Sequence, residues 1–460
     1  MPPIEQVPDG ETQASLPSGD DRRHFLKLAG TLIASIGVAE ALGACQKVMP
    51  LPSPAPAPAP TTTPTVTLTP TSTPAPTPQL TPSPASEPLR TRLARLLRRA
   101  GFSASKTELD RFETIGFDAT VDYLLDYEKV SDMNLASRLE SLKLDLAKAQ
   151  DLQRWWLLRM LYTQRPLQEK MVLFWHGLLT SGMSRVGRAD FMLKQNQLFR
   201  QQALGNFPVL LKAVSRDPAM LIWLDSRSNK KSAPNENFAR ELMELFTMGV
   251  GNYSERDVRE SARAFTGWFL RGSNFSFDPS QHDVGVKTFL GEAGSFSGDD
   301  IVDIIVSNPA TSDFICRKLF GFFAYEPPDE ATLSRMSLAF QGNGYGIKAA
   351  MRELLTSEAF LAADGSRVRP KSPTELVVGM IRSLGVETDA NGLLALMTRM
   401  GQTLFDPPNV AGWPGDAWLN SSTLLERINF ANQITTNRQS FSPSVSTTGG
   451  GGRSPEQIVD

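Results

Sequence analysis

The chain has 460 residues, 41% of them hydrophobic, and a formal net charge of −2 at pH 7. These values are typical of a globular protein, and the lack of a basic stripe in the sequence argues against a nucleic-acid partner. Only two cysteines occur, Cys45 and Cys316, and with Cys45 lipidated, as argued next, an intramolecular disulfide framework is excluded. Stability must therefore come from a large hydrophobic core, in which we expect Cys316 to lie.

The N-terminal segment has the pattern of a bacterial export signal. Arg22 and Arg23 precede Phe-Leu-Lys, as in twin-arginine signals, which address a folded protein for export across a membrane. The apolar stretch 28–44 contains Glu40 and is too short and weak for a permanent transmembrane helix, so residues 1–45 are predicted to be a signal peptide. Leu-Gly-Ala-Cys at its end resembles the lipobox of bacterial lipoproteins, which makes Cys45 the lipidated first residue of the mature chain. We therefore predict an exported protein anchored to the outer face of a bacterial membrane, at the cell surface or in the periplasm.

Residues 46–87 form a tract of Pro, Thr, Ser and Ala. Such a composition cannot form a packed core, and its prolines favour the extended polyproline II conformation. At ~3.1 Å per residue the tract would reach roughly 130 Å, so we predict a stalk that lifts a domain off the membrane. Residues 439–460 include Gly449 and the three glycines after it, and are predicted to be a disordered tail.

Between residues 88 and 438 apolar residues recur with helical spacing almost throughout. Ser105 to Glu108 and Ser254 to Asp257 are capping boxes that predict helix starts, and Gly249 is expected to end a helix. Residues 274–278 and 287–291 predict a short β-hairpin. We therefore expect a mainly α fold, a multi-helical globular domain with at most a short β-hairpin. Further helices are predicted over residues 150–164, 166–180, 186–203, 298–307, 311–324, 329–341, 346–360 and 371–384.

The segment from Asn235 to Phe246 is the densest group of candidate functional residues. As a helix it has apolar residues on one side and Glu236, Asn237, Arg240, Glu241 and Glu244 on the other. Glu236 and Glu244 flank Arg240 at four-residue spacing, which favours surface ion pairs on a solvated amphipathic helix. The other interpretation is a carboxylate cluster that binds a hard cation or supplies acid and base groups, because one arginine does not neutralise three glutamates.

After removal of the signal peptide the chain keeps two histidines, His176 and His282. His176 lies at the edge of the apolar face of a predicted helix, where a histidine is more often a structural group than a ligand. His282 precedes Asp283 in a predicted loop, which is typical either of a functional site or of a turn held by Asp283. His176, Glu241 and His282 are candidate ligands of a divalent metal ion. No His-Glu-x-x-His pair occurs, so such a site would have to join distant parts of the chain.

Trp413 and Trp418 lie in a rigid loop that begins at Asp406-Pro407-Pro408. If exposed, the two indole rings would stack on sugar rings and bind substrate. If buried, they would pin the loop to the helices, and burial is the expectation we favour because tryptophan is highly buried on average.

Six ordered motifs extend over the chain from about Leu89 to Arg438. They are Leu96–Phe102, Glu169–His176, Pro234–Leu242, Ala264–Trp268, His282-Asp283 with Gly285 and Lys287, and Pro407–Pro414. Taken together they resemble the bacterial domain of unknown function 1800 family (DUF1800). The resemblance implies an exported, largely helical protein whose activity is not established.

The resemblance also increases the weight given to the candidate catalytic residues. These are His176, Glu236, Arg240, Glu241, His282 and Asp283. Many members carry a second histidine two positions after the first, where this chain has Leu178, so a metal site that used that histidine would be altered or absent here. Many members are also encoded beside an exported protein of the sulfatase/phosphatase-like group, which implies a protein partner.

Two functions are compatible with these patterns. The first is an extracytoplasmic hydrolase acting on an envelope or extracellular polymer, with His176 or His282 as ligand or base and Glu236 or Glu241 as ligand or acid. In that enzyme Arg240 would orient a carboxylate or an anionic substrate group. The second is a non-catalytic lipoprotein that binds a partner or a polysaccharide. Convergence of the candidate residues in one pocket would favour the enzyme, and scattered positions would favour binding.

Overall fold

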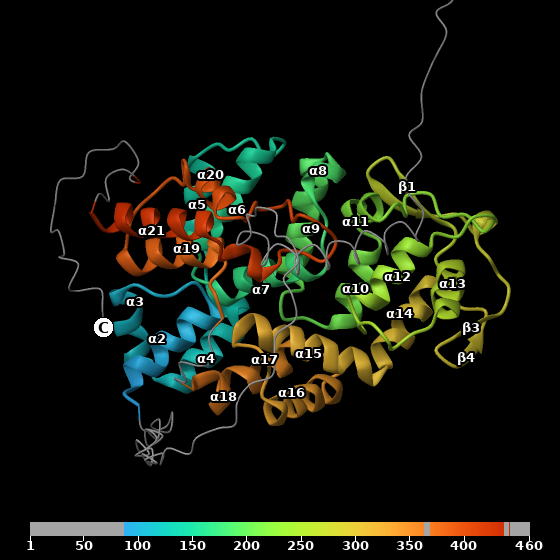
Figure 1. Ribbon diagram of the computed structural model, residues 1–460, viewed down its shortest axis with the longest axis horizontal. Coiled ribbons are helices and arrows are strands. Elements are labelled where there is room, and N and C mark those ends of the chain that lie inside the picture. Colours follow the sequence, from blue (N-terminus) through green and yellow to red (C-terminus); the bar gives the residue numbers. More distant parts are fainter. Residues whose placement is uncertain (1–86, 363–368, 437–440, 442–460) are drawn as a thin grey trace, which may run out of the picture. The chain divides into compact units, whose positions relative to one another are not determined.

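The computed structural model describes residues 87–362, 369–436 and 441, all within the unit formed by residues 78–460 (Figure 1). The predicted signal peptide, with Arg22, Arg23 and Cys45, lies outside the described residues. So do the predicted stalk and tail, apart from Glu87 and Phe441. Phe441 packs edge-to-face on Phe430, with ring centroids 5.7 Å apart.

Helices form most of the described part, which confirms the mainly α prediction. The α-helices are α2 (Leu89–Ala100), α3 (Lys106–Ile115), α4 (Phe117–Leu125), α5 (Met133–Ser141), α6 (Ala149–Tyr162), α7 (Pro166–Leu178), α8 (Met183–Val186), α9 (Ala189–Gln201), α10 (Phe207–Ser215), α11 (Pro218–Trp223), α12 (Glu236–Glu244), α13 (Glu255–Ala264), α14 (Gly298–Ser307), α15 (Pro309–Phe323), α16 (Glu330–Gly342), α17 (Ile347–Thr356), α18 (Glu358–Leu361), α19 (Pro373–Leu384), α20 (Leu393–Arg399) and α21 (Ser421–Thr436). Three short 3₁₀ helices are η2 (Tyr127–Lys129), η3 (Pro279–Gln281) and η4 (Gly415–Trp418).

Both predicted capping boxes are present. Ser105 accepts from the backbone N–H of Glu108 at the start of α3, and Ser254 accepts from that of Asp257 at the start of α13. Gly249 has a φ of 78°, but α12 ends earlier, at Glu244, and a turn fills the interval. The caps confirm that short local patterns set where these helices begin.

Two of the predicted helices have other bounds in the structure. The expected helix 186–203 begins only at Ala189, as α9, because Val186 ends the short helix α8 and Gly187 follows it in a left-handed conformation with a φ of 66°. The expected helix 346–360 splits at Ser357, whose hydroxyl accepts from the N–H of Phe360 and caps α18. In both places a local backbone signal interrupts a continuous apolar pattern.

The predicted pairing of strands is wrong. Residues 274–278 and 287–291 do not pair; instead two separate antiparallel hairpins form, β1 (Trp268–Arg271) with β2 (Asn274–Phe277) and β3 (Lys287–Phe289) with β4 (Glu292–Gly294). Leu290 and Gly291 both have positive φ, 48° and 89°, which closes β3 onto β4 through a tight turn. The local turns therefore select neighbouring strands as partners.

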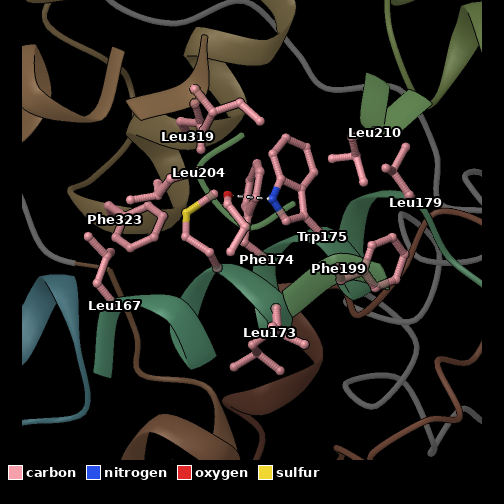
Figure 2. Close-up of a cluster of buried hydrophobic side chains, with 14 of the residues drawn as sticks. Leu167, Leu173, Phe174, Trp175, Leu179, Phe199, Leu204, Leu210, Leu319 and Phe323 are labelled. Carbon is pink, nitrogen blue, oxygen red and sulfur yellow. Dashed lines mark hydrogen bonds between the residues drawn. The ribbon is translucent and has the colours of Figure 1, made fainter. Parts of the chain in front are cut away.

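One hydrophobic core runs from Leu93 to Phe441. Helix α7 lies inside it and packs against α2, α4, α6 and α9. Trp175 on α7 is fully buried, and its indole N–H donates to the carbonyl of Ala203 at 3.0 Å (Figure 2, dashed). Cys316 on α15 is also fully buried, as expected, and burial raises the pKa of its thiol to about 12.

The first described helix is held by residues far along the chain. Arg95 and Arg99 on α2 donate to the carbonyl oxygens of Leu361 and Phe360, at the end of α18. Arg382 on α19 donates to the carbonyl of Leu161 on α6 at 2.9 Å.

Among the described residues, no helix has both the length and the apolar character that crossing a bilayer requires.

Candidate functional site

The loop that carries Trp413 lies directly on the C-terminal end of α7. A Cβ atom at Gly412 would fall 2.2 Å from the carbonyl oxygen of Gly177, and the φ of Gly412 is 88°. Only glycine fits this close approach of two backbones. The hydroxyl of Thr180 donates to the carbonyl of Val410 at 2.5 Å and holds the loop from the other side. Two family-like motifs, 169–176 and 407–414, therefore meet here.

Beside this contact lies a cleft of about 630 Å³. It lies between α7, α15, the segment 369–372 and the loop 411–419. Its polar lining residues are Lys318, Glu326, Arg369, Ser372 and Gln402, and its apolar ones include Leu178, Phe322, Trp413, Trp418 and Leu419. Leu178, two positions after His176, thus lines the cleft. A concave, mostly apolar surface with a few polar groups is typical of a ligand site.

The two tryptophans of the cleft are buried to different degrees. Trp418 is 7% exposed, as burial predicted, whereas Trp413 is only partly buried. The indole nitrogens of both are buried without a hydrogen-bond partner in the protein. The rings therefore pin the loop and also contribute surface to the cleft.

His176 lies behind Trp413, inside a cage of aromatic rings. Its ring centroid is 5.4 Å from those of Trp413 and Trp156 and 5.6 Å from that of Phe405. The side chain is almost completely buried, and neither ring nitrogen has a hydrogen-bond partner. Burial lowers the pKa of His176 to about 3. The imidazole is therefore neutral at physiological pH, and its surroundings are apolar.

Phe405 contributes an unusual backbone conformation to this cage. Its φ is 61°, in the left-handed region that disfavours bulky residues by about 1–2 kcal/mol. Its ring is fully buried against Trp156, and its carbonyl accepts the N–H of Met183 at 2.8 Å. Packing around His176 therefore outweighs local backbone preference.

The charged face of α12 is organised differently from the sequence prediction. Arg240 forms a two-point ion pair with Glu255 of α13, with both N–O distances 2.8 Å, rather than with Glu236 or Glu244. This pairing raises the pKa of Arg240. Glu244 accepts from the hydroxyl of Tyr253 at 2.6 Å. Across the contact between α12 and α13, Arg240 binds both oxygens of one carboxylate. A pair of side chains four residues apart on the same helix does not offer this bidentate geometry.

The outer surface of α12 remains open to solvent. Glu236 is exposed and Glu241 partly buried, while Phe238, Ala239, Leu242 and Met243 are buried. The amphipathic division expected from the sequence is thus confirmed.

His282 and Asp283 form a small hydrogen-bonded loop beside β2 and β3. His282 Nδ1 lies 2.9 Å from the carbonyl oxygen of Thr266, and because a carbonyl only accepts, Nδ1 is the donor of this hydrogen bond. Asp283 pairs with Arg263 at 2.7 Å, and this guanidinium lowers the pKa of the carboxyl. Lys287 is fully buried and donates to the carbonyl oxygens of Asp283 and Gly285. These bonds match the alternative of a turn held by Asp283.

The predicted site residues do not converge. His176 lies on α7, whereas α12 packs on α13 and α13 on β3, at the end of the unit that Figure 1 shows away from α7. Across the residues that the structure describes, no group of three or more His, Cys, Asp and Glu side chains is arranged to hold a metal ion. A shared ion at His176, Glu241 and His282 finds no support in this arrangement.

Buried ion pairs on α7 escaped the sequence analysis. Glu169, fully buried, accepts from Arg159 at 2.8 Å and from Arg200 at 2.6 Å; burial opposes its ionisation, but the two guanidiniums lower its pKa to about 2. Lys170 pairs with Glu375 of α19, and burial lowers the pKa of Lys170 to about 8. The signal in the sequence was the adjacent pair Glu169-Lys170 within an apolar stretch, but its partners are distant in sequence.

Comparison with known proteins assigns a family to the chain. The family model described as "Protein of unknown function (DUF1800)" matches residues 95–460. No curated protein and no solved structure matches the chain. The match confirms the resemblance seen in the sequence motifs and extends beyond residue 438 to residue 460.

Proposed function

The chain belongs to the DUF1800 family, and we propose that it is an exported lipoprotein that binds a polysaccharide in the cleft lined by Trp413 and Trp418. The observation that carries this proposal is the cleft itself, in which aromatic rings and a few polar groups face one space. Among the residues considered for acid–base chemistry, His176 lies behind Trp413 and does not line the cleft, and the others lie elsewhere, which favours binding over catalysis.

The lining of the cleft matches the chemistry of a sugar chain. Its volume of about 630 Å³ lies within the usual range for ligand pockets, roughly 300–1,000 Å³. Sugar rings present apolar faces that stack on indole rings, and hydroxyl groups that exchange hydrogen bonds with polar side chains. Trp413 supplies a partly exposed ring, and Gln402, Ser372 and Arg369 supply polar atoms.

Export and anchoring are proposed from the N-terminal sequence. The paired arginines, the apolar stretch and Cys45 occur in the order that a twin-arginine lipoprotein signal requires. Acyl chains on Cys45, at ~0.8 kcal/mol per buried methylene, would hold the protein on the outer face of a bacterial membrane. The proline-rich tract 46–87 would then present the domain to polymers outside that membrane.

A hydrolase remains the second proposal, but the cleft supports it less well. Hydrolysis of a glycosidic bond usually employs two carboxyl groups about 5–10 Å apart. Among the described lining residues of the cleft, Glu326 is the only carboxylate. The protein partner proposed from the resemblance, an exported sulfatase/phosphatase-like protein, would supply chemistry that this cleft lacks, and co-purification of the two from membranes tests that link.

Glycan binding is tested with the full-length chain and a panel of soluble polysaccharides, followed by quenching of tryptophan fluorescence and by pull-down. We expect saturable binding that Trp413→Ala weakens by about five-fold or more, since stacking on one aromatic ring is worth on the order of 1–3 kcal/mol. Phe277→Ala removes a half-exposed aromatic ring at a distance from the cleft and should leave binding intact.

Trp413 also contacts His176, so a second variant guards against a general loss of structure. Lys318→Ala alters an exposed residue of the cleft and leaves the aromatic cage untouched. Normal binding in both Trp413→Ala and Lys318→Ala, or no binding of any polysaccharide, would refute the proposal.

A further inference from the structure

A second pocket, of about 230 Å³, lies beside the cleft. It is formed by the end of α2, the end of α15 and the segment that leads into α19. Its charged lining residues are Arg98, Arg99, Arg369, Lys371 and Glu375. Arg369 lines both this pocket and the cleft, and Phe322 and Phe323, neighbours on α15, line the cleft and the pocket respectively. The volume is below the range for drug-sized ligands and suits a small group.

The one carboxylate that lines this pocket, among the described residues, is already engaged. Glu375 pairs with Lys170 and Arg369, and its second oxygen accepts the N–H of Ser372 at 2.7 Å. Glu375 therefore forms its ion pairs with Lys170 and Arg369, and its charge acts on Lys371 without an ion pair. Lys170 adds a further positive charge directly behind it.

The remaining cations lack carboxylate partners. Arg99 donates to the carbonyl of Phe360 and lies over the Phe360 ring, neither of which carries a charge. Within the described ranges, Arg98 and Lys371 have no carboxylate within ion-pair distance, while the neighbouring Arg95 is matched by Glu87 at 2.8 Å. Arg98 and Arg99 lie in the last turn of α2, where the helix dipole favours a positive charge. That effect does not extend to Lys371.

The pKa values of these groups indicate the same excess of positive charge. Burial is the main cause that lowers the pKa of Arg99 to about 10, and the positive charges of Arg98 and Arg95 contribute to the decrease. Burial and the charge of Arg98 also lower the pKa of Lys371. Arg98 and Lys371 are exposed to solvent and Arg99 is partly buried. Like charges gathered around one pocket repel one another, and a bound anion relieves that repulsion.

We propose that this pocket binds an oxyanion group, a phosphate or a sulfate, between Arg98, Arg99, Lys371 and Arg369. Guanidinium groups offer paired donors that match two oxygens of such a group, and the lysine adds a third donor. Ser103, which also lines the pocket, contributes a hydroxyl. The group is either a free ion or an ester on a polymer, and the shared Arg369 would let a polymer in the cleft direct its charged group here.

Inorganic phosphate and sulfate test the site directly, independently of polysaccharide binding in the cleft. We would titrate each ion into the full-length chain by calorimetry, with ionic strength held constant by sodium chloride to remove general screening. Arg98→Gln with Lys371→Gln should weaken binding by about ten-fold or more per residue, the usual effect of losing a hydrogen bond to a charged group. The matched control is Arg256→Gln with Arg259→Gln, which removes the same charge from exposed positions on α13.

A second arm distinguishes the two sources of the anion. Dextran sulfate and neutral dextran are compared on the same proteins. Saturable binding of an inorganic ion, lost in the pocket variant and kept in the control, supports a free-ion site. Binding of dextran sulfate alone, with the same dependence on Arg98 and Lys371, supports an ester group. The proposal is overturned if neither ion nor dextran sulfate binds, or if both double variants bind equally. Lys371→Gln alone, which leaves α2 unchanged, must show the same direction of effect.

Discussion

His176 is surrounded by aromatic rings that offer it neither a hydrogen bond nor a counter-charge. Its ring centroid lies 5.4 Å from that of Trp156 and 5.4 Å from that of Trp413, and both of its nitrogens are buried without partners. A protonated imidazole in such a place would be an unpaired buried charge, which is costly. At physiological pH the ring is therefore neutral and packs among the aromatic side chains.

The stability of the protein should depend on pH through His176. Its pKa is about 3 in the folded protein against 6.5 for an ordinary histidine, so the unfolded chain binds the extra proton between these values. The contribution of the neutral ring is thus complete above pH 6.5 and falls as pH drops toward 3, by up to about 5 kcal/mol. Urea unfolding at a series of pH values measures it.

The matching variants isolate this histidine from other titrating groups. In His176→Phe the free energy of unfolding should fall less steeply as the pH is lowered. Between pH 6.5 and 3 we expect its slope to be smaller than that of the native chain by about 1.4 kcal/mol per pH unit. His282→Gln keeps the buried histidine and should retain the steep dependence. Identical slopes in His176→Phe and the native chain would contradict a buried neutral imidazole.

Helix α7 connects three other helices through two adjacent buried charges. Glu169 bonds to Arg159 on α6 and Arg200 on α9, and Lys170 bonds to Glu375 on α19. Buried pairs contribute little net stability relative to apolar residues, but removing one partner leaves a charge without compensation. The pairs therefore fix how the helices are oriented around α7.

Glu169→Gln should destabilise the protein by about 3–5 kcal/mol, because it leaves Arg159 and Arg200 facing each other without a carboxylate. Glu387→Gln is the control. It breaks the exposed ion pair with Arg138, in which the Glu387 side chain is 62% exposed, and should cost less than about 1 kcal/mol. Denaturant unfolding of both variants decides, and equal midpoints would show that the buried pair has no special weight.

The contact between the loop 407–414 and α7 depends on Gly412. Gly412→Ala would force a methyl group to within 2.2 Å of the Gly177 carbonyl, and the loop would have to move off α7. We expect a loss of about 2 kcal/mol or more, together with weaker ligand binding in the cleft. Gly272→Ala is the control. Gly272 also has a positive φ, 60°, but the methyl group added there meets nothing within 4 Å. A larger loss in Gly272→Ala than in Gly412→Ala would refute the steric explanation.

At the scale of the whole molecule, the protein has one core drawn from both ends of the described chain. Leu93 near the start and Phe430 near the end belong to the same buried cluster. Contacts between distant residues form slowly because the intervening chain must be ordered first. Within the described residues, a partly made domain therefore has an incomplete core, which is compatible with the export of a folded protein proposed above.

The proposed export leads to a prediction about the whole chain. Changing Arg22 and Arg23 together to lysine should retain the protein in the cytoplasm, because the receptor reads the arginine pair. Cys45→Ala should still be exported but released from the membrane, since no acyl chain can be attached. Cell fractionation with immunoblotting measures both. Membrane-bound Cys45→Ala would argue against lipid anchoring at this residue.

Local patterns in the sequence predicted much of the fold. Ser105 and Ser254 mark helix starts because a cap needs only neighbouring residues. The strand pairing was missed because the turn at Leu290-Gly291, with a non-glycine residue at positive φ, has a weak sequence signal. Positions of elements were thus predictable, and some of their partners were not.

The candidate site was predicted residue by residue but not as an assembly. Trp413 was singled out, and its contact with His176 joins two motifs about 240 residues apart, a distance over which periodicity gives no information. Arg240 pairs across helices with Glu255, and not along its own helix. The basic pocket gave no sequence signal, because Arg98 and Lys371 come together only through folding of the chain.

The attachment of α2 to the end of α18 has a consequence for synthesis. Arg95 and its acceptor, the carbonyl of Leu361, are 266 residues apart. A ribosome that adds about 5–20 residues per second needs roughly 13–50 s to cover that separation. During that interval α2 can pack on α3 and α4, which follow it directly in the chain, but the carbonyl groups that Arg95 and Arg99 bind have not yet been made. The order of translation therefore makes the attachment of α2 to residues 360–361 a late step in the folding of a helix synthesised long before.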